Sequence, residues 1–224
     1  MKQLYLFGLL LSLPYIGFSQ GEFNNWYFGN HAGLNFSSGS PVVLTDCSPL
    51  FAAGYTNATV SDSLGNLLFY TDDHRVYTRN HTVMPNGNGL NVNDYQPMLP
   101  LKNLTDNSKY YLFTNDHTAS PVSPNPRGLR YWIVDMNLNG GLGDIPAGQK
   151  NLVIPGGEHA SNMVTGTRHH NLHDAWVITR DYTNDNYLSF LVTNSGINTP
   201  PAISHSTVPI TVYPGGGTAK HRPC

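Results

Sequence analysis

Three segments decide the fold of this chain, each an apolar run that ends in Thr-x-Asp. They read Leu67-Leu-Phe-Tyr-Thr-Asp-Asp73, Tyr110-Tyr-Leu-Phe-Thr-Asn-Asp116 and Ala175-Trp-Val-Ile-Thr-Arg-Asp181, with the threonines 43 and 65 residues apart. Their aromatic and β-branched side chains suit half-buried strands. A run of turn-forming residues precedes each segment, at 63–66, 106–109 and 171–174. The repeat therefore predicts three copies of one strand, each following a turn.

Further extended runs flank every copy of this strand. One run precedes the turn, at 58–62, 96–103 and 163–169, and another follows the Thr-x-Asp motif, at 75–80, 129–136 and 187–193. No window combines helical periodicity with capping signals at both ends. The repeating unit is therefore an antiparallel meander, and meanders at a period of about 40–65 residues are typical of a β-propeller. A β-sandwich whose strands are similar by accident is the alternative.

The first and last parts of the chain indicate that the propeller is incomplete. Trp26-Tyr-Phe-Gly29 and Leu34-Asn-Phe36 predict an N-terminal strand pair, the kind of piece that completes the last blade of a ring. About three blades plus this pair are fewer than the four or more blades of a closed ring. The tail, 209–224, has no strand pattern. We therefore expect a partial propeller over residues 20–208, a fragment of a longer protein whose open edges allow self-association.

The composition favours strands and turns and excludes an electrostatic nucleic-acid binder. Charged residues are only 12% of the 224 residues, and the net charge is −2. Twelve of the acids are Asp and two are Glu, and Asp prefers turns and caps to helix interiors. With 22 Gly and 16 Pro, this is a composition for short strands joined by tight turns.

Residues 1–19 have the pattern of a secretory signal peptide. Lys2 is followed by an apolar run from Leu4 to Leu13, and Gly17-Phe-Ser19 offers small residues for cleavage before Gln20. The run is too short to cross a membrane, and no later stretch is apolar enough to span one. We expect a secreted or cell-surface protein. Only Cys47 and Cys224 are present, and the sequence does not decide whether they pair.

Several ordered motifs resemble those of large secreted Bacteroidota proteins. They are Asn24-Asn-Trp-Tyr-Phe-Gly-Asn-His-Ala-Gly-Leu-Asn-Phe36, Gly65-Asn-Leu-Leu-Phe-Tyr-Thr-Asp72, Asn80-His-Thr-Val-Met-Pro-Asn-Gly87 and Ile133-Val-Asp-Met-Asn-Leu-Asn-Gly-Gly-Leu-Gly-Asp144. That family carries an N-terminal propeller-like region, often PKD-type domains, and a C-terminal sorting domain for type IX secretion that is associated with gliding motility. The family's later blades and its sorting domain have no counterpart here. The resemblance implies a surface module for adhesion or glycan contact and supplies no catalytic residues.

One segment resembles the first half of a calcium-binding loop. Asp135, Asn137 and Asn139, followed by Gly140, match D-x-N-x-N-G, but Pro146 stands where the closing Glu belongs. Asn and Gly also suit a plain β-hairpin between the third and fourth strands, and we expect a hairpin over 135–144 that needs no metal. Calcium is the only cofactor that the sequence suggests.

Two further groups of polar residues invite a catalytic or metal-binding interpretation. His169, His170 and His173 could bind zinc only if they converged, and their place at a strand end and in the next turn favours a polar turn. The acids Asp72, Asp73, Asp116 and Asp181 could serve a glycosidase, but they recur with the repeat, so we expect them to support turns. Trp26, Trp132 and Trp176 could either stack on sugars or fill the spaces between blades.

Three hypotheses follow from the sequence. The first is a non-catalytic propeller module outside the cell that binds glycan or protein. The second is a secreted glycan-active hydrolase on the same fold, and the third is a structural spacer of a larger surface protein.

Overall fold

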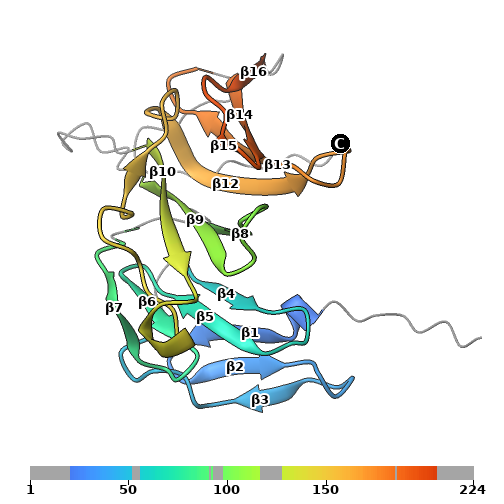
Figure 1. Ribbon diagram of the computed structural model, residues 1–224, viewed down its shortest axis with the longest axis vertical. Helices are drawn as coiled ribbons and strands as arrows, with labels where there is room; N and C mark the ends of the chain where they lie inside the picture. The colour runs from blue at the N-terminus through green and yellow to red at the C-terminus, as the bar shows by residue number, and fades with distance from the viewer. Residues whose placement is uncertain are drawn as a thin grey trace, which may run out of the picture.

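The chain is an open arc of antiparallel sheets. The computed structural model describes residues 21–51, 56–90, 92, 98–116, 128–184 and 186–205. Four sheets follow one another along the sequence and stack side by side, from the N-terminal sheet at one end of the arc to the last blade at the other (Figure 1). The predicted all-β partial propeller, with about three meander blades and an N-terminal piece, is confirmed.

Each blade is an antiparallel meander in sequence order, as the repeat predicts, with four strands in blades 1 and 2 and five in blade 3. Blade 1 consists of β4 (Ala58–Ser61), β5 (Leu67–Thr71), β6 (Arg75–Thr78) and β7 (Val83–Asn88). Blade 2 consists of β8 (Met98–Lys102), β9 (Lys109–Asp116), β10 (Gly128–Asp135) and β11 (Leu152–Val153). Blade 3 consists of β12 (Ala160–Arg168), β13 (Ala175–Asp181), β14 (Asn186–Thr193) and β15 (Gly196–Ile197), with β16 (Ala202–His205) also paired to β14.

The N-terminal sheet differs from the blades because it has three strands. They are β1 (Asn25–Gly29), β2 (Ala32–Asn35) and β3 (Val42–Leu44), preceded by the short 3-10 helix η1 (Gly21–Phe23). The strand pair that the sequence predicts is therefore a triplet. The third strand was missed because it has only three residues, too few to show alternation.

Three hydrophobic clusters hold the sheets together, and each fills the space between two neighbours. The first joins the N-terminal sheet to blade 1 through Tyr27, Cys47, Phe51, Tyr70 and Tyr77. The second joins blade 1 to blade 2 and contains Phe69, Leu112 and the almost fully buried Trp132. The third joins blade 2 to blade 3 and contains Phe113, Val177 and Phe190. Blades 1 and 2, which have a neighbour on each side, are therefore buried on both faces, whereas the N-terminal sheet and blade 3 are each buried on one.

The Thr-x-Asp motif is not in the same register in all three blades, which corrects one expectation. Tyr70 faces the N-terminal sheet, whereas Thr71 pairs with the buried Val76 on the opposite face, which packs against blade 2. In blades 2 and 3 the motif threonines share the face that looks back to the preceding blade, as their neighbours Leu112 and Val177 do. The β4–β5 ladder contains an irregularity at Val60 and Ser61, and one extra residue in a strand reverses the side-chain faces that follow. Tyr70, not Thr71, is therefore the counterpart of Thr114 and Thr179.

Candidate functional site

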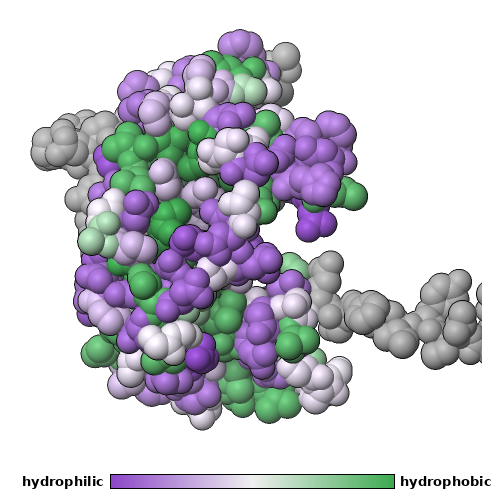
Figure 2. Space-filling model, viewed as in Figure 1, coloured by the Kyte–Doolittle hydropathy of each residue, from purple (hydrophilic) through white to green (hydrophobic). Residues whose placement is uncertain are grey.

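The outer face of the N-terminal sheet is an apolar surface that the described residues leave exposed. Asn25 and Tyr27 point toward blade 1 and are buried, whereas Trp26 and Phe28 point the other way and are 48% and 43% exposed. The ladders place Leu34 beside Trp26 and Val43 beside Leu34. We define the outer face by Trp26, Phe28, Leu34, Phe36 and Val43. Figure 2 shows hydrophobic residues gathered over this sheet at the lower end of the molecule.

The aromatic rings of the outer face meet edge to face. The Trp26 ring lies 6.3 Å from Phe28 at 67° and 5.7 Å from Phe36 at 63°. The Trp26 indole N–H donates to the carbonyl of Phe23 at 2.8 Å, which fixes the ring. Sugar rings stack best on an open, flat aromatic face, and rings crossed at these angles form an uneven apolar cluster instead. The geometry suits an apolar protein surface better than a glycan.

A groove runs beside the outer face, between β1 and β4. Its volume is about 200 Å³, and its lining includes Glu22, Phe23, Trp26, Phe28, Ala58 and Thr59. Within the part of the chain that the structure describes, β1 pairs only with β2, so the other edge of β1 faces this groove without a strand partner. The Tyr27 amide on that edge donates to the Thr59 hydroxyl at 3.0 Å.

The opposite side of the N-terminal sheet is a rigid support. Tyr27 stacks on Tyr70 at 5.0 Å, and Tyr70 stacks on Tyr77 at 4.9 Å. The Tyr27 hydroxyl donates to Asp46 Oδ1 at 2.9 Å, and the Tyr70 hydroxyl accepts from the Ser48 amide at 2.9 Å. Burial raises the pKa of Tyr70 to about 12 and the pKa of Tyr27 further, so both hydroxyls stay neutral at pH values near 10, where exposed tyrosine ionises. Stacked rings and hydrogen bonds on its inner face therefore hold the N-terminal sheet, and with it the outer face, in place.

The calcium candidate at Asp135, Asn137 and Asn139 is a hydrogen-bonded turn. Asp135 Oδ1 accepts from the Asn137 amide at 2.9 Å, and Asn137 Nδ2 donates to Ser108 Oγ at 2.8 Å. Asn139 begins the 3-10 helix η2 (Asn139–Gly141). The predicted hairpin over 135–144 is reduced to a single bridge between Asp135 and Asp144, and the true fourth strand is β11. The eight intervening residues are too many for a tight two-residue hairpin.

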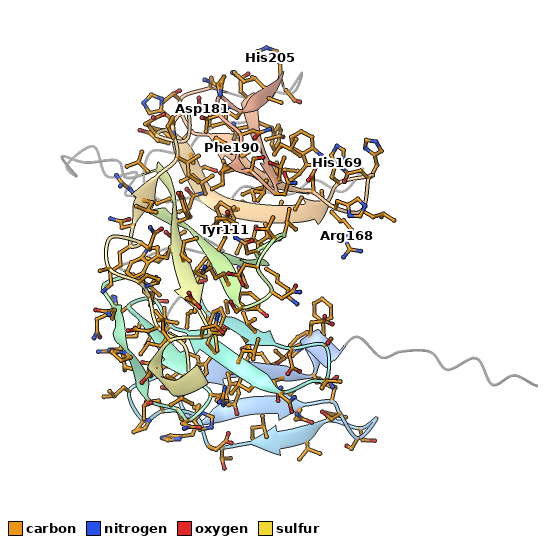
Figure 3. All side chains as sticks on the ribbon, in the orientation of Figure 1. Tyr111, Arg168, His169, Asp181, Phe190 and His205 are labelled. Atoms are coloured by element: carbon orange, nitrogen blue, oxygen red, sulfur yellow. The ribbon has the colours of Figure 1, made fainter. Side chains whose placement is uncertain are left out.

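The histidines of 169–173 lie in the turn between β12 and β13. The His169 and His170 rings are 4.2 Å apart, and Asn171 holds the turn by accepting from the His173 and Asp174 amides at 3.0 Å each. Figure 3 places His169 at one end of blade 3 and Asp181 at the other. A shallow hollow of about 560 Å³ lies between this turn and Leu104–Thr105, but its lining is mostly polar and contains no Trp, Tyr or Phe. The smaller groove beside β1 is the better candidate for binding.

Two of the repeated acids, Asp72 and Asp181, support the turns that follow them, as their recurrence suggests. Asp72 accepts from the His74 and Arg75 amides at 2.8 and 2.6 Å and from the Tyr77 hydroxyl at 2.6 Å. Asp73 Oδ1 accepts from the Thr56 amide at 3.0 Å. Asp181 accepts from Thr183 and Asn184 in the next turn. The side chain of Asp116 lies outside the described residues.

The three tryptophans occupy different environments. Trp132 is buried between blades 1 and 2, Trp176 is half-buried on blade 3, and Trp26 belongs to the outer face.

Cys47 is a buried free thiol whose pKa is raised by burial. Cys224 and the predicted signal peptide, residues 1–19, lie outside the described residues, as do Gln20 and the tail. Sequence reasoning singled out Trp26 but did not predict the outer face. The alternation of Trp26 and Phe28 with Tyr27 could have predicted it, because alternate side chains of a strand lie on opposite faces.

The described part of the chain contains neither a cluster of metal-ligating side chains nor a membrane-spanning helix. Among the described residues, no three His, Cys, Asp or Glu side chains gather closely enough to hold a metal ion. Within those same residues, no helix has the length and apolarity needed to cross a bilayer. Comparisons with family models, with curated proteins and with solved structures found no match to this chain. The resemblance to secreted Bacteroidota proteins therefore stays a prediction from the sequence.

Proposed function

We propose that this chain is a non-catalytic binding module that works outside the cell and attaches to another protein through the outer face of its N-terminal sheet. One observation carries the proposal. The described residues leave an organised, aromatic-rich sheet face exposed, whereas the faces between neighbouring sheets are buried. Exposed apolar patches that rest on a rigid base are typical of protein interaction sites.

The choice of protein over glycan rests on the crossed rings of Trp26, Phe28 and Phe36. The choice of binding over catalysis rests on the acids, since the Asp72, Asp73 and Asp181 carboxylates accept hydrogen bonds from neighbouring groups. The extracellular location rests on the pattern of residues 1–19.

Site-specific photo-crosslinking in the producing cell tests the proposal. A benzophenone amino acid replaces Phe28 in one variant and Leu64, an 84% exposed residue of the β4–β5 turn, in the control. We expect position 28 to yield an adduct with one defined polypeptide that position 64 does not form. Equal adducts from both positions, or a glycan array signal that depends on Phe28 without any protein adduct, would refute the proposal.

A further inference from the structure

Among the residues that the structure describes, the N-terminal sheet has fewer strands than any of the blades. Blades 1, 2 and 3 begin with β4, β8 and β12, each paired antiparallel to the second strand of its own blade. The N-terminal sheet has the order β1-β2-β3, one strand fewer than blades 1 and 2. Which strand is absent follows from the position that β1 occupies against blade 1.

Packing contacts assign β1 to the second position of a blade. At the interface of blades 2 and 3, β12 packs mainly on β9, the second strand of blade 2, and also on β8, whereas at the interface of blades 1 and 2 the first strands β4 and β8 pack on each other. β1 packs on β4, and its Tyr27 ring stacks on Tyr70 of β5, just as Phe69 of β5 meets Tyr110 of β9 between the second strands of blades 1 and 2. The contacts of β9 and of β1 each include a buried asparagine that reaches into the next blade. Asn115 Nδ2 donates to the Met163 carbonyl of β12 at 3.3 Å and to Thr179 Oγ1 of β13 at 3.1 Å, and Asn25 Nδ2 donates to Ser61 Oγ of β4 at 3.0 Å.

The edge of β1 where a first strand would pair is the edge that borders the groove. The Phe36 amide donates to the Asn24 carbonyl at 2.9 Å, so the backbone groups of even-numbered residues in β1 point toward β2. Those of Asn25 and Tyr27 therefore point to the groove, because the direction alternates along an antiparallel strand. The Tyr27 amide there bonds only to a side-chain hydroxyl, that of Thr59, which an incoming backbone carbonyl can replace.

We infer that the partner polypeptide inserts an extended strand into this groove and pairs antiparallel with β1, completing a four-stranded sheet. The inference rests on the proposed function, because the same partner then covers Trp26 and Phe28. Backbone pairing gives such a contact its affinity, and alternate side chains give it specificity.

The lining of the groove defines the chemistry of the incoming strand. One side is apolar, with Phe23, Trp26 and Phe28, and the other is small, with Ala58 and Thr59. Glu22 precedes β1, so it lies near the C-terminal end of an antiparallel strand. The strand should therefore be uncharged along its length and end in a basic residue. Two first strands of this chain have that ending, β8 in Lys102 and β12 in Arg168.

A synthetic peptide of residues 163–168, Met-Val-Thr-Gly-Thr-Arg, is the probe, because it is the last part of β12. It is titrated into the isotope-labelled chain while backbone amide shifts and exchange rates are recorded. We expect saturable binding with one peptide per chain, and about tenfold slower exchange of the β1 amides, while those of β6 do not change.

Two backbone-methylated peptides provide the matched controls. One carries N-methyl groups on Val164, Gly166 and Arg168, and the other carries them on Thr165 and Thr167. Because alternate amides of a strand point in opposite directions, only one of the two peptides should lose binding, by about tenfold or more. Glu22→Gln should weaken the unmethylated peptide about threefold at low salt. Equal loss by both methylated peptides, loss by neither, or no binding at millimolar peptide would overturn the strand pairing.

The outcome can be separated from that of the proposed function. A protein adduct at position 28 together with a peptide that does not bind would support the proposed binding function and refute the pairing of a partner strand with β1. A dimer that the peptide dissociates would identify a second copy as the donor and overturn the assignment to a partner polypeptide.

Discussion

Asp72→Ala should destabilise the chain by about 4 kcal/mol, and the structurally equivalent Asp181→Ala by about 1 kcal/mol. Both acids accept the amide of the residue two positions later, from His74 and from Thr183, each at 2.8 Å. They differ in burial, because Asp72 is only 2% exposed and also accepts the hydroxyl of the fully buried Tyr77 at 2.6 Å. The partners of Asp181 lie in an exposed turn.

The magnitude follows from the groups that each substitution leaves without a partner. Hydrogen bonds to a charged acceptor contribute about 1.5–3 kcal/mol, and a buried donor without a partner costs about 1–3 kcal/mol. Asp72→Ala removes bonds from two turn amides, which water can partly replace, and from one hydroxyl that water cannot reach. It also removes the 3.4 Å ion pair with the partly exposed Arg75 guanidinium, which adds little. Three such losses at the lower limit give about 4 kcal/mol, a large part of the total stability of a domain. At Asp181 water replaces all of the lost bonds.

Urea unfolding followed by tyrosine and tryptophan fluorescence measures both variants against the parent chain. A double-mutant cycle with Tyr77→Phe isolates the contribution of the hydroxyl, which we expect to couple to Asp72 by about 1–3 kcal/mol. If Asp72→Ala cost no more than Asp181→Ala, the buried network would be irrelevant to stability and Asp72 would be available for another role.

The remaining predictions concern the core, the tyrosine stack, the calcium candidate and the leader. Phe113→Ala, at the interface of blades 2 and 3, should cost about 3–5 kcal/mol in urea unfolding, whereas Leu64→Ala at the exposed turn should change stability by less than about 0.5 kcal/mol. The pKa of Tyr70 is raised to about 12 by burial, and those of Tyr27 and Tyr77 are raised further, while unfolded tyrosine ionises near pH 10. The stability that comes from these raised pKa values is complete below about pH 10 and is lost as the pH rises toward about 12. Absorbance at 295 nm should therefore show these tyrosines ionising at the same pH as the chain unfolds. Their ionisation in a chain that is still folded at about pH 10 would contradict this prediction. Calcium added after chelation should leave Tm unchanged, because Asp135 and Asn137 are already hydrogen-bonded to the turn, and a rise of several degrees would restore the calcium site. Intact-mass measurement of the secreted protein should show Gln20 as its first residue, and a mature chain that begins at Met1 would refute the signal peptide.

Most of the fold could be predicted from the sequence because the repeat is local. The strands of each meander are neighbours in the chain, and turn residues such as those at 63–66 and 171–174 mark their boundaries. Short strands could not be predicted, since Val42–Leu44 and Gly196–Ile197 are too brief to show alternation. The register of blade 1 could not be predicted either, because an irregularity in a ladder leaves no mark on composition.

The candidate site was harder to predict, for a physical reason. Its apolar residues have the same alternation as a buried strand, and only the stacking of the sheets shows that Trp26 and Phe28 face outward. The edge of β1 is likewise a property of sheet order, which depends on partners that no local pattern specifies. The acids and histidines attracted attention in the sequence because they are chemically reactive, yet in the fold they belong to turns.

The strict sequence order of the strands has a consequence for how this molecule acquires its structure. Every ladder among the described residues joins strands that are next or nearly next to each other in the chain, so little chain entropy is spent on closing long loops. A blade can thus form as soon as its last strand has emerged, without waiting for distant residues. The N-terminal sheet is the exception, because one edge of β1 has no strand partner among the described residues. If a partner supplies the strand beside it, the first sheet to emerge is the last to be finished, and its completion depends on the concentration of another polypeptide and not on the speed of folding.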